Sequence, residues 1–129
     1  MTLEEMIRNV AALERLPERT AAIAAEKLGE LVARTAAAGT SPDGEAWAPR
    51  KEGGRAMVNA AAHVSARAYG DVVRITLRGP DVFHQFGTRG EPRRAVIPES
   101  GAAMPASVAQ VLEQASRQAF EEITSGVRR

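Results

Sequence analysis

The 129-residue sequence contains no cysteine, and its only large aromatic residues are one tryptophan, one tyrosine and three phenylalanines. Without cysteine there are no disulfides, no thiolate zinc sites and no cysteine nucleophile. Alanine supplies much of the 44% hydrophobic content, so roughly a quarter of the chain is Val, Ile, Leu, Met or aromatic. So thin a core favours burial against neighbouring copies, with a loosely packed small domain as the alternative.

Strong charge of one sign is also missing. The formal net charge is +1, whereas a dedicated nucleic-acid binder usually carries a strong basic excess. No apolar run approaches the ~20 residues that span a bilayer. The second helical segment mixes acidic and basic residues, so it lacks the basic face of a membrane-surface helix. We therefore expect no membrane partner.

Residue patterns that support catalysis are absent as well. His63 and His84 are isolated, without H-x-x-x-H or H-E-x-x-H spacing. No serine stands in a G-x-S-x-G turn, and Gly87 and Gly90 do not open a phosphate loop. We expect no catalytic residue, no metal and no cofactor, and therefore no enzyme.

What is present predicts an α+β fold in one domain, residues 1–129. Residues 1–38 are expected to be helical, beginning at a capping box of Thr2 and Glu5, interrupted near Pro17 and ending at Gly39. Residues 104–124 are expected to form a long C-terminal amphipathic helix. Its apolar face would contain Val108, Val111, Leu112, Ala115, Ala119, Phe120 and Ile123.

The middle of the chain predicts a small antiparallel sheet. Residues 39–54 read as an extended loop, and residues 63–78 as a β-hairpin that turns at Gly70. A short helical turn is expected at 55–59. Residues 81–98 are expected to be a loop with a short strand at 95–97. Within them Val82, Phe83 and Phe86 are spaced to dock on the sheet, and residues 88–94 are expected to be exposed.

Two charged loops contain the candidate interface residues. Trp47 either caps the core and pins its loop, or anchors a protein contact. The basic residues would form salt bridges between subunits, stay solvated, or contact DNA phosphates. Glu52 and Glu91 interrupt them, and no row of aromatics is interleaved for base stacking. The candidates are Trp47, Arg50, Lys51, Arg55, Arg89, Arg93 and Arg94.

Two motifs occur in a fixed order. The first, S-P-D-G-x-x-W-x-P-R, contains Ser41, Pro42, Asp43, Gly44 and Trp47. The second, F-H-Q-F-G-T, contains Phe83, His84, Gln85, Phe86 and Gly87, and is followed by Ile97 and Pro98. Over residues 13–123 the chain resembles the tailed-bacteriophage virion morphogenesis family of neck and tail-completion proteins. The resemblance implies a structural virion protein that forms a hexameric ring in the neck.

The resemblance has departures. The family commonly continues past the I-P pair with an arginine and a bulky aromatic, where this chain has Glu99 to Ala103. Asp81-Val82-Phe83 replaces the usual tyrosine-alanine pair. The partners implied are other copies, phage neck and tail proteins and, in passing, genomic DNA in the lumen. Assembly would take place in the host cytoplasm. A head-closure role and a DNA-binding packaging accessory remain the alternatives.

Overall fold

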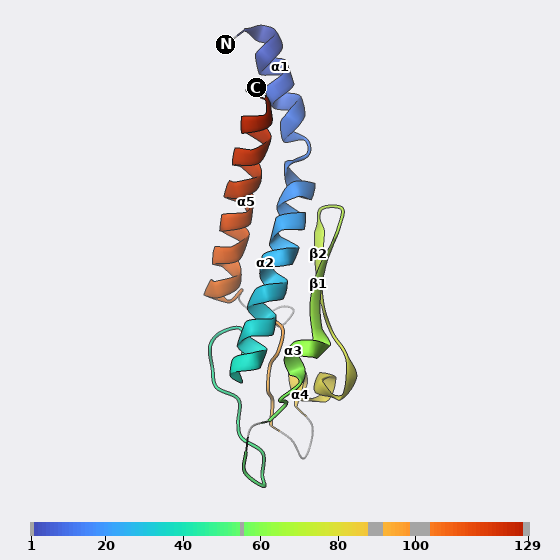
Figure 1. The fold of residues 1–129 in the computed structure, drawn as a ribbon, viewed down its shortest axis with the longest axis vertical. Helices are drawn as coiled ribbons and strands as arrows, with labels where there is room; N and C mark the ends of the chain where they lie inside the picture. The colour runs from blue at the N-terminus through green and yellow to red at the C-terminus, as the bar shows by residue number, and fades with distance from the viewer. Residues whose placement is uncertain (1, 55, 88–91, 99–103, 128–129) are drawn as a thin grey trace.

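The computed structural model describes residues 2–54, 56–87, 92–98 and 104–127. Its long helices are α1 (Leu3–Leu13), α2 (Leu16–Ala38) and α5 (Ala106–Val127). α1 extends beyond α2 after a bend, and α5 runs antiparallel alongside both (Figure 1). Both ends of the chain therefore lie at one end of an elongated molecule. We name this the helical end, and the opposite one the loop end.

Local signals in the sequence set the bounds of the first two helices. The Thr2 side chain accepts a hydrogen bond from the Glu5 amide at 3.1 Å, and the Glu5 carboxylate accepts one from the Thr2 amide at 2.7 Å. The predicted capping box is therefore confirmed. Pro17 lies in the first turn of α2, just after the break. Gly39 ends α2 in the left-handed conformation at φ 77°, which glycine adopts without strain.

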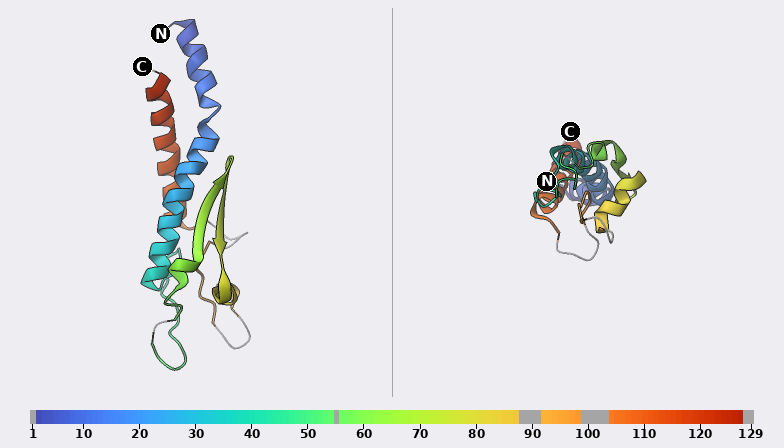
Figure 2. Two further views of the ribbon diagram at one scale, coloured as in Figure 1. Left: turned by 45° about the vertical axis from the view of Figure 1, so that its right-hand side comes forward. Right: turned by 90° about the horizontal axis from the view of Figure 1, so that it is seen from below.

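The hairpin packs on one side of α2. Strands β1 (Val64–Tyr69) and β2 (Val72–Leu77) pair antiparallel, with Val64 opposite Leu77, and the chain turns at Gly70. Alternate residues face α2, so one face of the sheet is covered and the other is open to solvent (Figure 2). The predicted α+β architecture, with a hairpin and a long C-terminal helix, is confirmed.

The core is built from small residues. One cluster joins α2 to α5, and a second joins the lower part of α2 to β1 and to residue 96. The largest fully buried side chains are those of Val32 and Val96. Phe120 of α5 was predicted to lie on the buried face, but it is 49% exposed. Alanines at 115 and 119 bring α5 close to α2, which leaves no room for a phenyl ring between the two helices.

An ion pair adds a polar contact between α2 and α5. The Arg19 guanidinium donates to the Glu122 carboxylate at 2.7 Å. This hydrogen bond, with a second one from Gln118, holds the pKa of Glu122 below its usual range. A carboxylate with a lowered pKa stabilises the fold above its unfolded-state pKa, and that contribution is lost as the pH falls through the folded-state value. Because the pair is exposed, its contribution is small.

The loop end contains the irregular structure. A short helix, α3 (Ala60–His63), leads into β1, and a 3₁₀ turn, η1 (Gly79–Asp81), leads into α4 (Val82–Phe86). The helical turn expected at 55–59 is wrong for residues 56–59, because the helix begins at Ala60, and residue 55 lies outside the described residues. The strand expected at 95–97 is also wrong, since side chains rather than a neighbouring strand bind that backbone. Across the described ranges, no helix has the length and apolarity that crossing a membrane requires.

Candidate functional site

The segment 92–98 is the centre of the loop end, and Gln85 of α4 holds it in place. The Gln85 side chain is 2% exposed. Its Oε1 accepts hydrogen bonds from the amides of Val96 at 2.8 Å and Ile97 at 3.0 Å. Its Nε2 donates to the Ile97 carbonyl at 2.9 Å. One side-chain amide therefore takes the place of a neighbouring strand.

Arg94 fastens the same segment to the 40s loop. It was predicted to be an exposed partner contact, but its side chain is only 2% exposed. Its guanidinium donates to the carbonyls of Ala48 at 2.7 Å and Pro49 at 3.0 Å, and lies 2.9 Å from Nδ1 of His84. The prediction for Arg94 is wrong, because three fixed acceptors inside the chain attract a planar, five-donor cation. His84 is correspondingly a structural partner of Arg94.

Trp47 binds the segment from its other side. The indole Nε1 donates to the Ala95 carbonyl at 2.8 Å, and the ring is half-buried. The interpretation that Trp47 pins its loop to the core is therefore confirmed. Its second predicted role, as an anchor for a partner, stays a prediction. Part of the ring faces an open cavity, so a partner has access to it.

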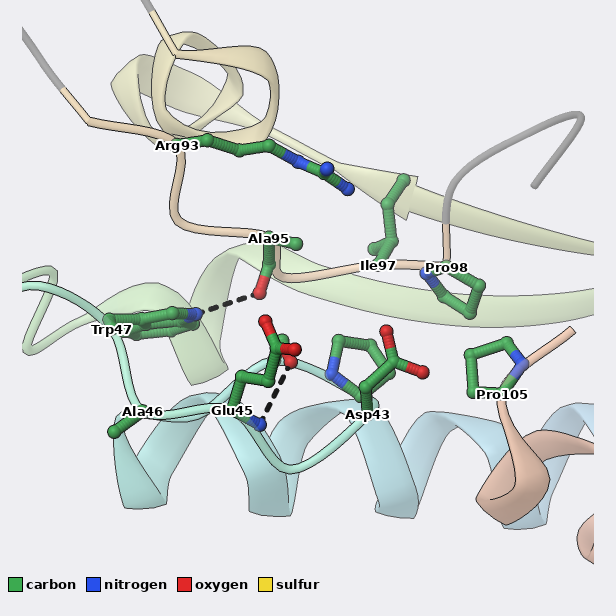
Figure 3. A pocket seen from close by; sticks show the side chains of 11 residues that line it. Asp43, Glu45, Ala46, Trp47, Arg93, Ala95, Ile97, Pro98 and Pro105 are labelled. Atoms are coloured by element: carbon green, nitrogen blue, oxygen red, sulfur yellow. Dashed lines mark hydrogen bonds between the residues drawn. The ribbon is translucent and has the colours of Figure 1, made fainter. Parts of the chain in front are cut away.

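This cavity has a volume of about 600 Å³. It lies between the 41–47 loop and the 92–98 segment, and we name it the Trp47 groove (Figure 3). The first motif shapes one wall, since the Ser41 amide donates to the Glu45 carbonyl at 2.8 Å and the Gly44 amide to the Ser41 carbonyl at 2.9 Å. The lining residues are Ser41, Pro42, Asp43, Glu45, Ala46, Trp47, Arg93, Ala95, Ile97, Pro98 and Pro105.

The apolar residues of α4 point away from the sheet. Val82, Phe83 and Phe86, which we name the α4 patch, are 40%, 66% and 68% exposed. The prediction that they dock on the sheet is wrong, because the inward side of this short helix is occupied by Asp81 and Gln85, both buried. Gly87 ends α4 at φ 77°, as predicted. The second motif therefore presents two phenyl rings to the surface.

Asp81 joins the base of α4 to α3. Its Oδ2 contacts Nδ1 of His63, and the Asp81 side chain is buried. Replacing Asp81 by asparagine is expected to lower the free energy of unfolding by about 1–3 kcal/mol, because a charged hydrogen bond is lost in a buried place. Urea denaturation measures this loss. The matched control is Asp71→Asn at the exposed hairpin turn, expected to change stability by less than about 0.5 kcal/mol. Equal losses in the two variants would contradict a structural role for the Asp81 contact.

The remaining basic candidates differ in position. Arg50, Lys51 and Arg93 are exposed, and Arg50 lies 3.7 Å from Glu52. Arg55 and Arg89 lie outside the described residues. A second cavity, of about 310 Å³, is lined by Arg50, Lys51, Glu52, Ala56, Met57, His84 and Arg94. The two charged loops are thus brought together around Arg94.

At the helical end, α1 exposes its large apolar residues. Leu3, Met6, Ile7 and Val10, which we name the α1 stripe, are each at least 50% exposed, whereas Ala12 is buried. The helix thus packs on the molecule by a small residue and presents its bulky side chains to solvent. An isolated helix of this length is only marginally stable in water, so a partner on the stripe would stabilise it.

Comparison of the chain with protein-family models, curated proteins and solved structures finds no match. In the part of the chain that the structure describes, no three His, Asp or Glu side chains gather where they could hold a metal ion. The exposed α4 patch and the Trp47 groove make the loop end a candidate site for contact. Sequence patterns missed the inward positions of Asp81 and Gln85, although their spacing of four residues would have placed them on one face of a helix.

Proposed function

We propose that this chain is a structural subunit of a bacteriophage neck, forming a ring that completes or terminates the tail and joins it to the head. One observation carries the proposal. All three phenylalanines are exposed, by 66%, 68% and 49%, while the core is filled by alanine, valine, leucine and isoleucine. Large aromatic side chains contribute most when buried, so a subunit that exposes them gains stability on assembly.

The positions of the exposed residues support a ring stacked between other components. The α4 patch lies at the loop end, and the α1 stripe at the helical end (Figure 1). A subunit of a stacked ring needs surfaces for its neighbours within the ring and for the components above and below it. In the proposal, the α1 stripe serves the contact at one end.

The two motifs behind the phage resemblance also meet in space. Trp47 of the first motif and Gln85 of the second both bind the segment 92–98, although they are far apart in the sequence. A pair of motifs that jointly shapes one surface is what a shared assembly contact requires. The contact that both motifs make with segment 92–98 therefore supports the function that the resemblance implies.

Deletion of the gene, followed by electron microscopy of lysates, tests the proposal. Over-long tails are expected if the ring terminates the tail. Leaking heads beside free tails of normal length are expected if it closes the head. Intact, infectious particles from the deletion strain would contradict both roles. The matched complementation uses the wild-type chain and a Phe83→Ser, Phe86→Ser variant, with the variant expected to fail.

Duplex DNA binding is a second candidate function, favoured by the open face of the hairpin. Arg67 of β1 stands directly opposite Arg74 of β2, and both are exposed. Like charges in this position repel each other, so an anionic partner would stabilise the pair. The Arg74 guanidinium also lies 5.0 Å from the centre of the Tyr69 ring.

If this face binds DNA, the affinity for a labelled duplex is expected to fall steeply with salt. Changing both arginines to glutamine should then reduce the slope of log K against log salt by about 2. Fluorescence anisotropy measures this slope. Arg117→Gln on α5 is the control, because Arg117 pairs with Glu113 at 2.6 Å on another face. Absence of binding at low salt would remove this candidate.

A further inference from the structure

Among the residues that the structure describes, two surfaces of the loop end remain open within one copy, and segment 92–98 separates them. On one side α4 reaches the segment through Gln85, and on the other the 40s loop reaches it through Trp47. The exposed α4 patch therefore does not enter the Trp47 groove of its own chain. Both surfaces lie at the same end of the elongated molecule (Figure 1).

The lining of the groove combines apolar and charged side chains, with polar atoms contributing the larger part of its surface. Its apolar residues include Trp47 and Ile97, with prolines at 42, 98 and 105. The carboxylates of Asp43 and Glu45 stand on one wall, and Arg93 comes from the other (Figure 3). Its volume of about 600 Å³ is in the range that receives bulky apolar groups.

The α4 patch has the complementary character. Phe83 and Phe86 project rings that are about two-thirds exposed. Basic residues lie on segments next to α4. Arg78 precedes η1 and is exposed, and Arg50 and Lys51, with Glu52, line a cavity that also contains His84 of α4. An aromatic surface with basic neighbours matches a groove whose lining contains an indole ring, three prolines and two carboxylates.

We propose that Phe83 and Phe86 of one copy insert into the Trp47 groove of the next copy. The inference deepens the proposed function and rests on its claim of self-assembly. Because patch and groove are different surfaces, the contact is head-to-tail, and such contacts close into a ring when the rotation between copies allows it. A two-fold contact of patch against patch would leave every groove empty. In a closed ring each patch and each groove is used once.

Chemical cross-linking tests the pairing directly, because the chain has no cysteine of its own. Val82→Cys and Ala46→Cys each introduce one thiol, the first on the α4 patch beside the two phenylalanines and the second on the groove wall. A short bismaleimide is expected to yield dimers from the mixture of the two variants, and little from either variant alone. The double variant is expected to yield a ladder of covalent oligomers. Cross-linking of Val82→Cys with itself would overturn the head-to-tail contact.

Association measured by analytical ultracentrifugation provides a second readout. Each of Phe83→Ser and Phe86→Ser is expected to weaken association by about 30-fold or more, as for central aromatic contacts in interfaces. Ala46→Lys, at an exposed position of the groove wall, is expected to do the same from the other side. The matched control is Phe120→Ser, an exposed phenylalanine on α5, expected to leave the association constant within about threefold.

The outcomes separate this inference from the proposed function. A wild-type chain that assembles, with no link between positions 82 and 46 and no effect of Phe86→Ser, overturns the inference and leaves the ring proposal standing. A wild-type chain that stays monomeric at every concentration tested overturns the inference too. The ring proposal is instead overturned by normal particles from the deletion strain, whatever the cross-links show.

Discussion

Arg94→Ala is expected to lower the free energy of unfolding by about 3 kcal/mol, one of the two largest losses expected at the loop end. The guanidinium is buried and donates to two backbone carbonyls of the 40s loop. Hydrogen bonds from a charged donor contribute about 1.5–3 kcal/mol each, and the truncated side chain also leaves a cavity. Urea denaturation monitored by Trp47 fluorescence measures the change, since Trp47 lies in the loop that Arg94 holds.

The neighbouring residue provides the control. Arg93 is exposed, and Arg93→Ala is expected to change stability by less than about 0.5 kcal/mol. Arg94→Lys should fall between the two, because an ammonium cannot reproduce the planar fork of the guanidinium. Similar losses at positions 93 and 94 would show that Arg94 does not hold the two loops together.

Gln85→Leu is expected to cost about 3 kcal/mol, although leucine is the more apolar residue. The substitution leaves the amides of Val96 and Ile97 without their acceptor, and Val96 is fully buried. Each buried donor left without a partner costs about 1–3 kcal/mol. Hydrogen exchange at the Val96 amide should also become faster, which reports the loss locally.

Gln114→Leu on α5 is the matched control for this substitution. Gln114 is exposed, and leucine suits a helix, so a change of less than about 0.5 kcal/mol is expected. If Gln85→Leu proved neutral or stabilising, with protected exchange at Val96, the segment 92–98 would have to be held by other contacts. The shape of the Trp47 groove would then not depend on Gln85.

Local signals in the sequence predicted the regular elements well. The capping box of Thr2 and Glu5, the stop at Gly39 and the hairpin turn at Gly70 each act through neighbours in the chain. The thin core was also predictable, because the composition limits the volume of apolar side chains that can be buried. These features needed no knowledge of distant contacts.

The loop end was harder to predict because distant partners decide it. Asp81 contacts a residue 18 positions away, and Gln85 bonds to one 12 positions away. These two polar contacts turn α4 so that its phenylalanines face outward, against the ordinary rule of apolar burial. Arg94 is likewise buried by acceptors 45 and 46 positions away. Periodicity within a few residues contains no information on such contacts.

The expectation for segment 95–97 failed for a related physical reason. Its short apolar run is typical of a strand, and its backbone does form strand-like hydrogen bonds. The partners are the Gln85 amide and the Trp47 indole, and no strand among the described residues pairs with this segment. Both residues belong to the motifs behind the phage resemblance, so those motifs specify how the loop end is built.

Cryo-electron microscopy of the head–tail junction in purified particles tests the central claim, that this chain works by assembling into a neck ring. The expected result is a closed ring of this chain between head and tail, with α4 of each copy seated in the Trp47 groove of the next. Particles that lack the chain, or that contain it outside the junction, would contradict a neck ring.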